Sequence, residues 1–178
     1  MPSNTRSRVI APVIGAAIIL TMLSPAMAGA GAPSRARGAG QLRDLQTSID
    51  NPTDHATAQI VATESGGKTT VSLKVQGLDH GAAGATMGAH VHVGPCVEGN
   101  GGAAGPHYNS SSDVPPVIND QTEVWLDFIV EANGQGRASA TVPFLIPEGG
   151  AGSAVIHMNP TDHAGAAGAR LACIPVAF

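Results

Sequence analysis

The chain has 178 residues, among them 23 Gly and 13 Pro, only 12% of them are charged, and its formal net charge is −4. This length fits one domain preceded by a segment that lies outside its core. A negative charge has the wrong sign for a protein that neutralises phosphates, so we expect no nucleic acid among its partners.

The first 28 residues have the pattern of a secretory signal peptide. Arg6 and Arg8 precede an apolar run over 9–23, and Ala26 and Ala28 supply the small residues of a cleavage site. The run is shorter than the roughly 20 residues that span a bilayer, and an uncleaved anchor is the alternative. We predict an exported protein, secreted or in the periplasm or cell envelope, with no stable membrane anchor after cleavage. Cleavage leaves seven basic and thirteen acidic residues, a net charge of −6.

Residues 29–42 are rich in Gly, Ala, Ser and Arg and show no hydrophobic period. Such a segment buries too little apolar surface to offset the entropy lost on ordering, so we expect a flexible leader. The folded domain is then expected to span residues 43–178.

From residue 43 onward, short β-branched runs alternate with Gly, Pro, Asn and Asp, which predicts an all-β domain. Turns rich in Gly and Asn at 65–68 and 133–136 predict two antiparallel hairpins. Two long loops, 94–121 and 159–170, are expected to be functional. The expected strands are 57–63, 69–75, 89–93, 124–131, 137–142, 154–158 and 173–178.

The hexamer Asn-Pro-Thr-Asp-His-Ala occurs at 51–56 and again at 159–164. Six residues are too few for a fold repeat, and we interpret the hexamer as a recurring turn. A shared metal-binding role for the two Asp-His pairs is the alternative. His55, His80 and His163 are expected to be surface loop residues.

The chain has two cysteines, Cys96 and Cys173. In an exported small domain, two cysteines favour a disulfide over two free thiols. We therefore expect a bridge that closes a long loop.

Four histidines stand out: His90 and His92, which are two apart on an expected strand, His107 after a Gly-rich loop, and His157 on a late strand. A spacing of two sends both imidazoles of the first pair to the same face. Imidazole ligands suit Cu(II) or Zn(II) rather than Ca²⁺ or Mg²⁺. The pattern predicts a transition-metal site, although His-x-His alone is a weak signal.

Several segments together resemble the copper/zinc superoxide dismutase family. They are Gly-Ala-His-Val-His at 88–92, Gly-Pro-His-Tyr-Asn at 105–109, Val-Ile-His at 155–157 and Gly-Ala-Arg-Leu-Ala-Cys at 168–173. They occur in the order typical of that family, and the resemblance extends from about residue 56 to the C-terminus.

The resemblance implies a Greek-key eight-stranded β-barrel, an immunoglobulin-like sandwich with two long functional loops. It also implies copper ligands at His90, His92, His107 and His157, a disulfide between Cys96 and Cys173, and Arg170 as a catalytic residue that guides the anion. The implied activity is conversion of superoxide to hydrogen peroxide and oxygen by Cu(II)/Cu(I) cycling. A copper sink or carrier and a structural barrel with a vestigial site are the alternatives.

The sequence departs from the family at the zinc site, because no histidine occurs between 108 and 156. Glu123 and Leu126 fall where a zinc His and Asp are expected, and Asp113 and Asp120 are further acids of this region. A structural zinc site with so few nitrogen or sulfur ligands is improbable, so we expect copper without zinc. Asp162, the one acid of the second long loop, is expected to hold a copper histidine through its second ring nitrogen.

Overall fold

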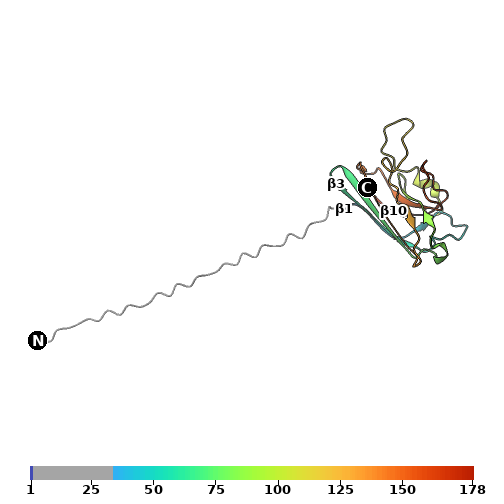
Figure 1. Ribbon diagram of the computed structural model, residues 1–178, viewed down its shortest axis with the longest axis horizontal. Coiled ribbons are helices and arrows are strands. Elements are labelled where there is room, and N and C mark those ends of the chain that lie inside the picture. Colours follow the sequence, from blue (N-terminus) through green and yellow to red (C-terminus); the bar gives the residue numbers. More distant parts are fainter. Residues whose placement is uncertain (2–33) are drawn as a thin grey trace. The chain divides into compact units, whose positions relative to one another are not determined.

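The computed structural model of the chain describes Met1 and residues 34–178 (Figure 1). The expected signal peptide, apart from Met1, lies outside the described residues. No helix in this described part is long and apolar enough to cross a membrane.

The first of two larger sheets contains β1 (Ser34–Gln41), β3 (Thr57–Ser65), β4 (Lys68–Gln76) and β8 (Gln135–Val142), in the spatial order β1-β3-β4-β8. All neighbouring strands are antiparallel, and β1 and β3 run side by side in Figure 1. Gly66 and Gly67 join β3 to β4 with φ values of 58° and 75°, a conformation that glycine adopts without strain. The first hairpin prediction is confirmed.

The second sheet contains β2 (Arg43–Asp44), β10 (Arg170–Pro175), β9 (Ser153–His157) and β6 (Ala89–His92), in the order β2-β10-β9-β6. A small ribbon pairs β5 (Thr86–Met87) with β7 (Phe128–Ile129), and two short 3₁₀ turns, η1 (His80–Ala82) and η2 (Gly101–Ala104), lie in loops. The described residues form no α-helix. The all-β antiparallel fold is therefore confirmed.

Alternation along the strands places the hydrophobic core between the two larger sheets. Ile60 on β3 and Val71 on β4 are fully buried, and they join a cluster that also contains Val91 of β6 and Ile156 of β9. Every second residue of these strands thus faces the core. The opposite face of β6 carries His90 and His92, and that of β9 carries His157 and Val155, which packs in a second buried cluster with the two cysteines.

The expectation of a flexible leader is wrong for residues 34–41, because these residues form β1 and pair with β3 along its length. The hydrophobic pattern is missing because Gly38 faces the backbone of β10: a Cβ at Gly38 would lie 2.1 Å from the carbonyl oxygen of Pro175. Close packing here requires the absence of a side chain. The first sheet consequently begins before residue 43.

The predicted strand 124–131 is also corrected, since only Phe128–Ile129 of this run lies in a sheet ladder. Val124, Leu126, Phe128 and Val130 are buried and face the core. The run also pairs with β6 through an isolated bridge between Trp125 and His90, in which the N–H of Leu126 donates to the carbonyl of Ala89. The turn near Gly134 closes with a hydrogen bond from its N–H to the carbonyl of Glu131. However, β8 then pairs with β4 and β7 with β5, so the second hairpin prediction is wrong.

Candidate metal centre

The register of β6 and β9 brings distant histidines together. His90 and His92 share the face of β6 opposite the buried Val91. β9 runs antiparallel beside β6 and ends at His157. His107 reaches the same place because its backbone forms an isolated bridge with His92.

The four imidazoles form a compact cluster. Each offers one nitrogen atom, and the four atoms all lie within 4.8 Å of one another. Among the described residues, no other group of three or more His, Cys, Asp or Glu side chains brings its ligand atoms this close together. The rings of His90 and His107 lie 3.9 Å apart between centroids, and Nε2 of His92 lies 3.4 Å from Nε2 of His157. Three of the rings are buried, and the His107 side chain is 17% exposed.

Three of the histidines are oriented through Nδ1. Nδ1 of His92 lies 3.0 Å from the carbonyl oxygen of Gly105, and Nδ1 of His157 lies 3.3 Å from that of Gly168. Nδ1 of His107 lies 2.8 Å from a carboxylate oxygen of Glu123. Carbonyl and carboxylate oxygens only accept, so each Nδ1 donates its proton and each Nε2 keeps a lone pair that faces the cluster.

His90 has the opposite orientation. Its Nε2 lies 2.8 Å from the hydroxyl of Thr161, and its Nδ1 is buried without a hydrogen-bond partner in the described part of the chain. A buried polar atom without a partner costs free energy, and its presence here calls for an explanation.

Burial keeps the imidazoles of His90, His92 and His157 neutral. It lowers the pKa of His90 to about 2, with further lowering by the neighbouring His107, His157 and His92. Burial likewise lowers the pKa of His92 to about 3 and that of His157 to about 4, against opposing hydrogen bonds to Gly105 and Gly168. Neutral imidazole is the form that binds a metal ion.

Glu123 holds His107 from the side away from the cluster. Its carboxylate accepts hydrogen bonds from His107, from the indole N–H of Trp125 at 2.9 Å and from the amide of Asn109 at 3.0 Å. Burial alone raises the pKa of Glu123, but the three hydrogen bonds outweigh burial and leave it below its usual value. Leu126, the other residue at an expected zinc position, lies in the core, while Asp113 and Asp120 are exposed.

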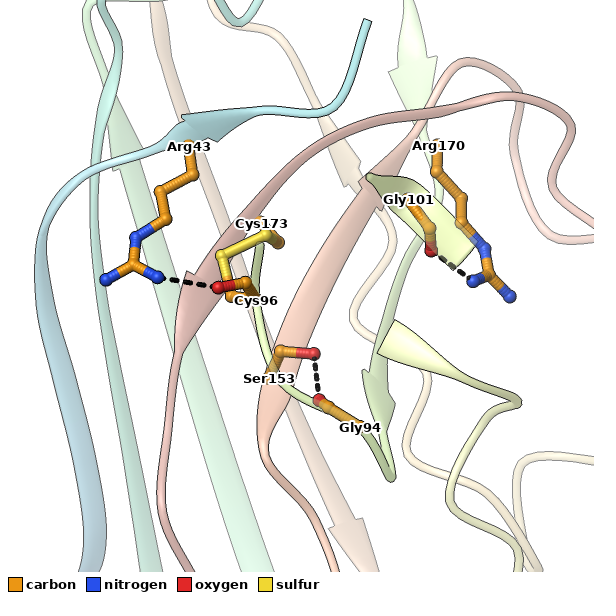
Figure 2. Close-up of a disulfide and its surroundings, with 7 residues drawn as sticks. All are labelled: Arg43, Gly94, Cys96, Gly101, Ser153, Arg170 and Cys173. Carbon is orange, nitrogen blue, oxygen red and sulfur yellow. Dashed lines mark hydrogen bonds between the residues drawn. A yellow bond between two sulfur atoms is a disulfide. The ribbon is translucent and has the colours of Figure 1, made fainter. Parts of the chain in front are cut away.

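Arg170 opens β10 and pairs with His157 in the ladder between β9 and β10. Its guanidinium donates hydrogen bonds of 2.6 Å to the carbonyl of Gly101, as Figure 2 shows, and of 2.7 Å to that of Gly105. Burial lowers the pKa of Arg170 from its ordinary value. Arg170 and His107 both line a surface pocket formed by 106–109, 116–123 and 164–170.

The disulfide between Cys96 and Cys173 is confirmed, with the two Cα atoms 5.6 Å apart. It joins the first long loop to β10 (Figure 2), and Arg43 donates a hydrogen bond to the carbonyl of Cys96. Ser153 of β9 donates another to the carbonyl of Gly94. The loop that carries the partners of Arg170 is therefore held at its base.

The expectation for Asp162 is corrected. Asp162 is exposed, and its carboxylate accepts the backbone N–H groups of Ala164 and Ala166, which lower its pKa. The loop uses this acid for its own turn, so it does not reach a ring nitrogen.

Sequence reasoning missed two residues behind His90. Thr161 bonds to the ring of His90 through its hydroxyl, and Asp127 accepts a hydrogen bond from that hydroxyl. Asp127 is the one charged residue in the run 124–130, and that isolated charge was the available signal. The other three histidines, His55, His80 and His163, are exposed as expected.

Comparison with known proteins places this geometry in a family. A search of curated proteins gives no match to the chain. A family model described as copper/zinc superoxide dismutase (SODC) matches residues 54–175, a range that includes the four clustered histidines, both cysteines and Arg170. Because this range covers well over half of the chain, the chain belongs to the copper/zinc superoxide dismutase family.

Proposed function

We propose that the protein is an exported superoxide dismutase that uses copper and has no zinc site. The observation that carries the proposal is the contact between Nε2 of His92 and Nε2 of His157, 3.4 Å apart. Both Nδ1 atoms donate to carbonyl oxygens, so two lone pairs face each other across this contact. A cation between them relieves the repulsion.

The donor set fits copper. Nδ1 of His90 and the Nε2 atoms of His92, His107 and His157 would hold the ion, and Nδ1 of His90 thereby gains the partner that it lacks. Four neutral imidazoles suit Cu(II) among the first-row metals. When bound, copper supplies the one-electron oxidation and reduction that superoxide dismutation requires.

The absence of zinc is supported by Glu123. A zinc ion shared with His107 needs Nδ1 of that ring, and this nitrogen is already bonded to the Glu123 carboxylate at 2.8 Å. The sequence provides no other histidine between 108 and 156 to complete a zinc site.

The chain's own residues bind and orient the substrate. Two guanidinium N–H groups of Arg170 are engaged by the carbonyls of Gly101 and Gly105, which holds the side chain in place. The remaining N–H groups can donate to a small anion in the pocket that Arg170 shares with His107. The side chains of His90 and His92 are fully buried, so the surrounding residues exclude water from their ring nitrogens.

Export is supported by the sequence pattern over residues 1–28 and by the disulfide, which is compatible with an oxidising compartment. After cleavage the net charge of −6 repels an anionic substrate, so capture depends on the local positive charge of Arg170.

Reconstitution with both metals tests the proposal. We expect about one copper and little zinc per chain by elemental analysis, and superoxide consumption above that of free copper. His92→Ala should bind copper far more weakly, whereas the control His55→Ala, at an exposed position, should bind it normally. A tightly held zinc at one per chain contradicts the copper-only assignment, and equal loss in both variants contradicts the ligand assignment.

A copper sink or carrier is the second candidate, and the net charge of −6 favours it because a repulsive field slows superoxide capture. A copper-loaded protein that consumes no more superoxide than free copper would establish this alternative.

A further inference from the structure

The imidazole of His90 begins a chain of hydrogen bonds that leads away from the cluster. Its Nε2 lies 2.8 Å from Oγ1 of Thr161, and this hydroxyl lies 2.5 Å from Oδ1 of Asp127. The same Oδ1 accepts the backbone N–H of Ala89 at 3.3 Å, and Oδ2 accepts that of Thr161 at 2.7 Å. Asp127 thus ties the second long loop to the residue that precedes His90.

The donor and acceptor capacities of these groups determine the direction of the chain. A carboxylate only accepts hydrogen bonds, and a hydroxyl has a single proton to donate. Thr161 must therefore give its proton to Asp127, and it can only accept from His90. Nε2 of His90 then carries the ring proton, and Nδ1 is left with a lone pair.

That lone pair belongs to the buried nitrogen without a partner. The His90 ring lies 3.9 Å from the ring of His107 and 4.9 Å from that of His157, between centroids. The other three histidines carry the ring proton on Nδ1, which donates it to a carbonyl or carboxylate oxygen, and they turn Nε2 to the cluster. Of the four, His90 alone offers the opposite nitrogen, and among the described residues Thr161 is the one that bonds to its outer nitrogen.

We propose that Thr161 and Asp127 are positioning residues that select the ring tautomer of His90 and thereby give the metal site its fourth nitrogen. The ligand role of His90 rests on the proposed function, whereas the tautomer is a property of the metal-free chain. Groups that orient a metal-binding histidine in this way typically contribute 10–100-fold in metal affinity.

The chain contains a matched control for this role. Thr53 occupies the same place as Thr161 in the other copy of the hexamer Asn-Pro-Thr-Asp-His-Ala, but its hydroxyl bonds to Asn51 within its own turn. Thr53→Val and Thr161→Val therefore remove the same hydroxyl from the same six residues, and only one of the two is connected to His90.

The first measurement is long-range proton–nitrogen correlation NMR on the full metal-free chain with isotope-labelled histidine, at neutral pH. We expect His90 protonated at Nε2, and His92, His107 and His157 protonated at Nδ1. In Thr161→Val the His90 signals should move toward a mixture of tautomers, while Thr161→Ser and Thr53→Val should keep the original pattern. His90 protonated at Nδ1 in the unchanged chain overturns the proposal.

The second measurement is Cu(II) affinity against a competing chelator, together with the electron paramagnetic resonance spectrum of the copper-loaded chain. Thr161→Val should lose about 10–100-fold in affinity and change the spectrum, and Thr161→Ser should restore both. If Thr161→Val has the same copper affinity and the same spectrum as the unchanged chain, the proposal is overturned. If Thr161→Val does not fold, two other results test the proposal. They are the tautomer of His90 in the unchanged chain, and the copper affinity and spectrum of Asp127→Asn.

The two proposals can fail separately. The expected tautomers and copper affinities without superoxide consumption support the positioning role and refute the dismutase. Superoxide consumption with His90 protonated at Nδ1 supports the dismutase and refutes the positioning role.

Discussion

His92 and Arg170 are held by the same atom, the carbonyl oxygen of Gly105. The oxygen accepts a hydrogen bond from Nδ1 of His92 at 3.0 Å and another from the guanidinium of Arg170 at 2.7 Å. The proposed metal ligand and the proposed anion-binding residue are thus oriented together, although 78 positions separate them in the chain.

Gly105 cannot be replaced without moving this carbonyl. Its backbone has φ 67° and ψ −160°, a conformation that only glycine adopts readily, and a Cβ there would lie 2.9 Å from Val93. We expect Gly105→Ala to lower the free energy of unfolding by about 1–3 kcal/mol and to weaken copper binding. Urea unfolding and copper titration check this. The control is Gly149→Ala, because Gly149 also has a positive φ but a Cβ there would contact nothing, so this variant adds backbone strain alone. Copper affinity lowered equally in both variants contradicts the shared role of the carbonyl.

Arg170→Ala should retain copper, because the guanidinium makes no bond to the metal, while superoxide consumption falls about 10–100-fold through loss of charge-assisted hydrogen bonds to the anion. Added salt should change the rate of the unaltered protein differently from that of the variant, since salt screens the local attraction. The comparison cancels the repulsion from the net charge that both share. An unchanged rate in the copper-loaded variant excludes Arg170 from substrate binding.

Removal of the disulfide should lower both stability and activity. The bridge closes a loop of 77 residues, and the chain-entropy model gives about 4 kcal/mol for a loop of this size. In Cys96→Ala/Cys173→Ala we expect a lower urea midpoint, and also slower superoxide consumption, because the loop with the carbonyls of Gly101 and Gly105 is no longer held to β10. Equal midpoints for the double variant and the unaltered protein contradict this expectation.

The metal-free protein should lose stability as the pH falls below about 6.5. In the unfolded chain histidine binds a proton near pH 6.5, whereas burial keeps His90, His92 and His157 neutral in the fold until pH values of about 2, 3 and 4. The unfolded state therefore binds more protons throughout this window, and each histidine increases the unfolding constant by up to about tenfold per pH unit.

Thermal unfolding of the metal-free chain between neutral pH and about pH 5 measures this effect before the carboxylates titrate. His157→Gln should reduce the slope, since one of the three groups is then absent, and His163→Gln, at an exposed position, should leave it unchanged. A melting temperature independent of pH over this range contradicts the burial of neutral imidazoles.

Local periodicity was enough to predict the strands β3, β4, β6 and β9, because every second side chain of each faces one core. It also predicted that His90 and His92 share a face. It failed for β1, whose residues are ordered by backbone pairing and by the close approach of Gly38 to Pro175. Such a contact leaves no hydrophobic pattern to read.

The two identical hexamers show which contacts the sequence alone does not determine. From the residues alone, Thr53 and Thr161 are equivalent, and so are Asp54 and Asp162. In the structure Thr53 bonds to Asn51 beside it, whereas Thr161 reaches His90 and Asp127, which lie 71 and 34 positions away. The sequence by itself determined which side chains can bind a metal and that strands would carry them. Only the tertiary structure decided which carboxylate, Asp127 rather than Asp162, supports His90, because hydrogen bonds depend on distance in space and not along the chain.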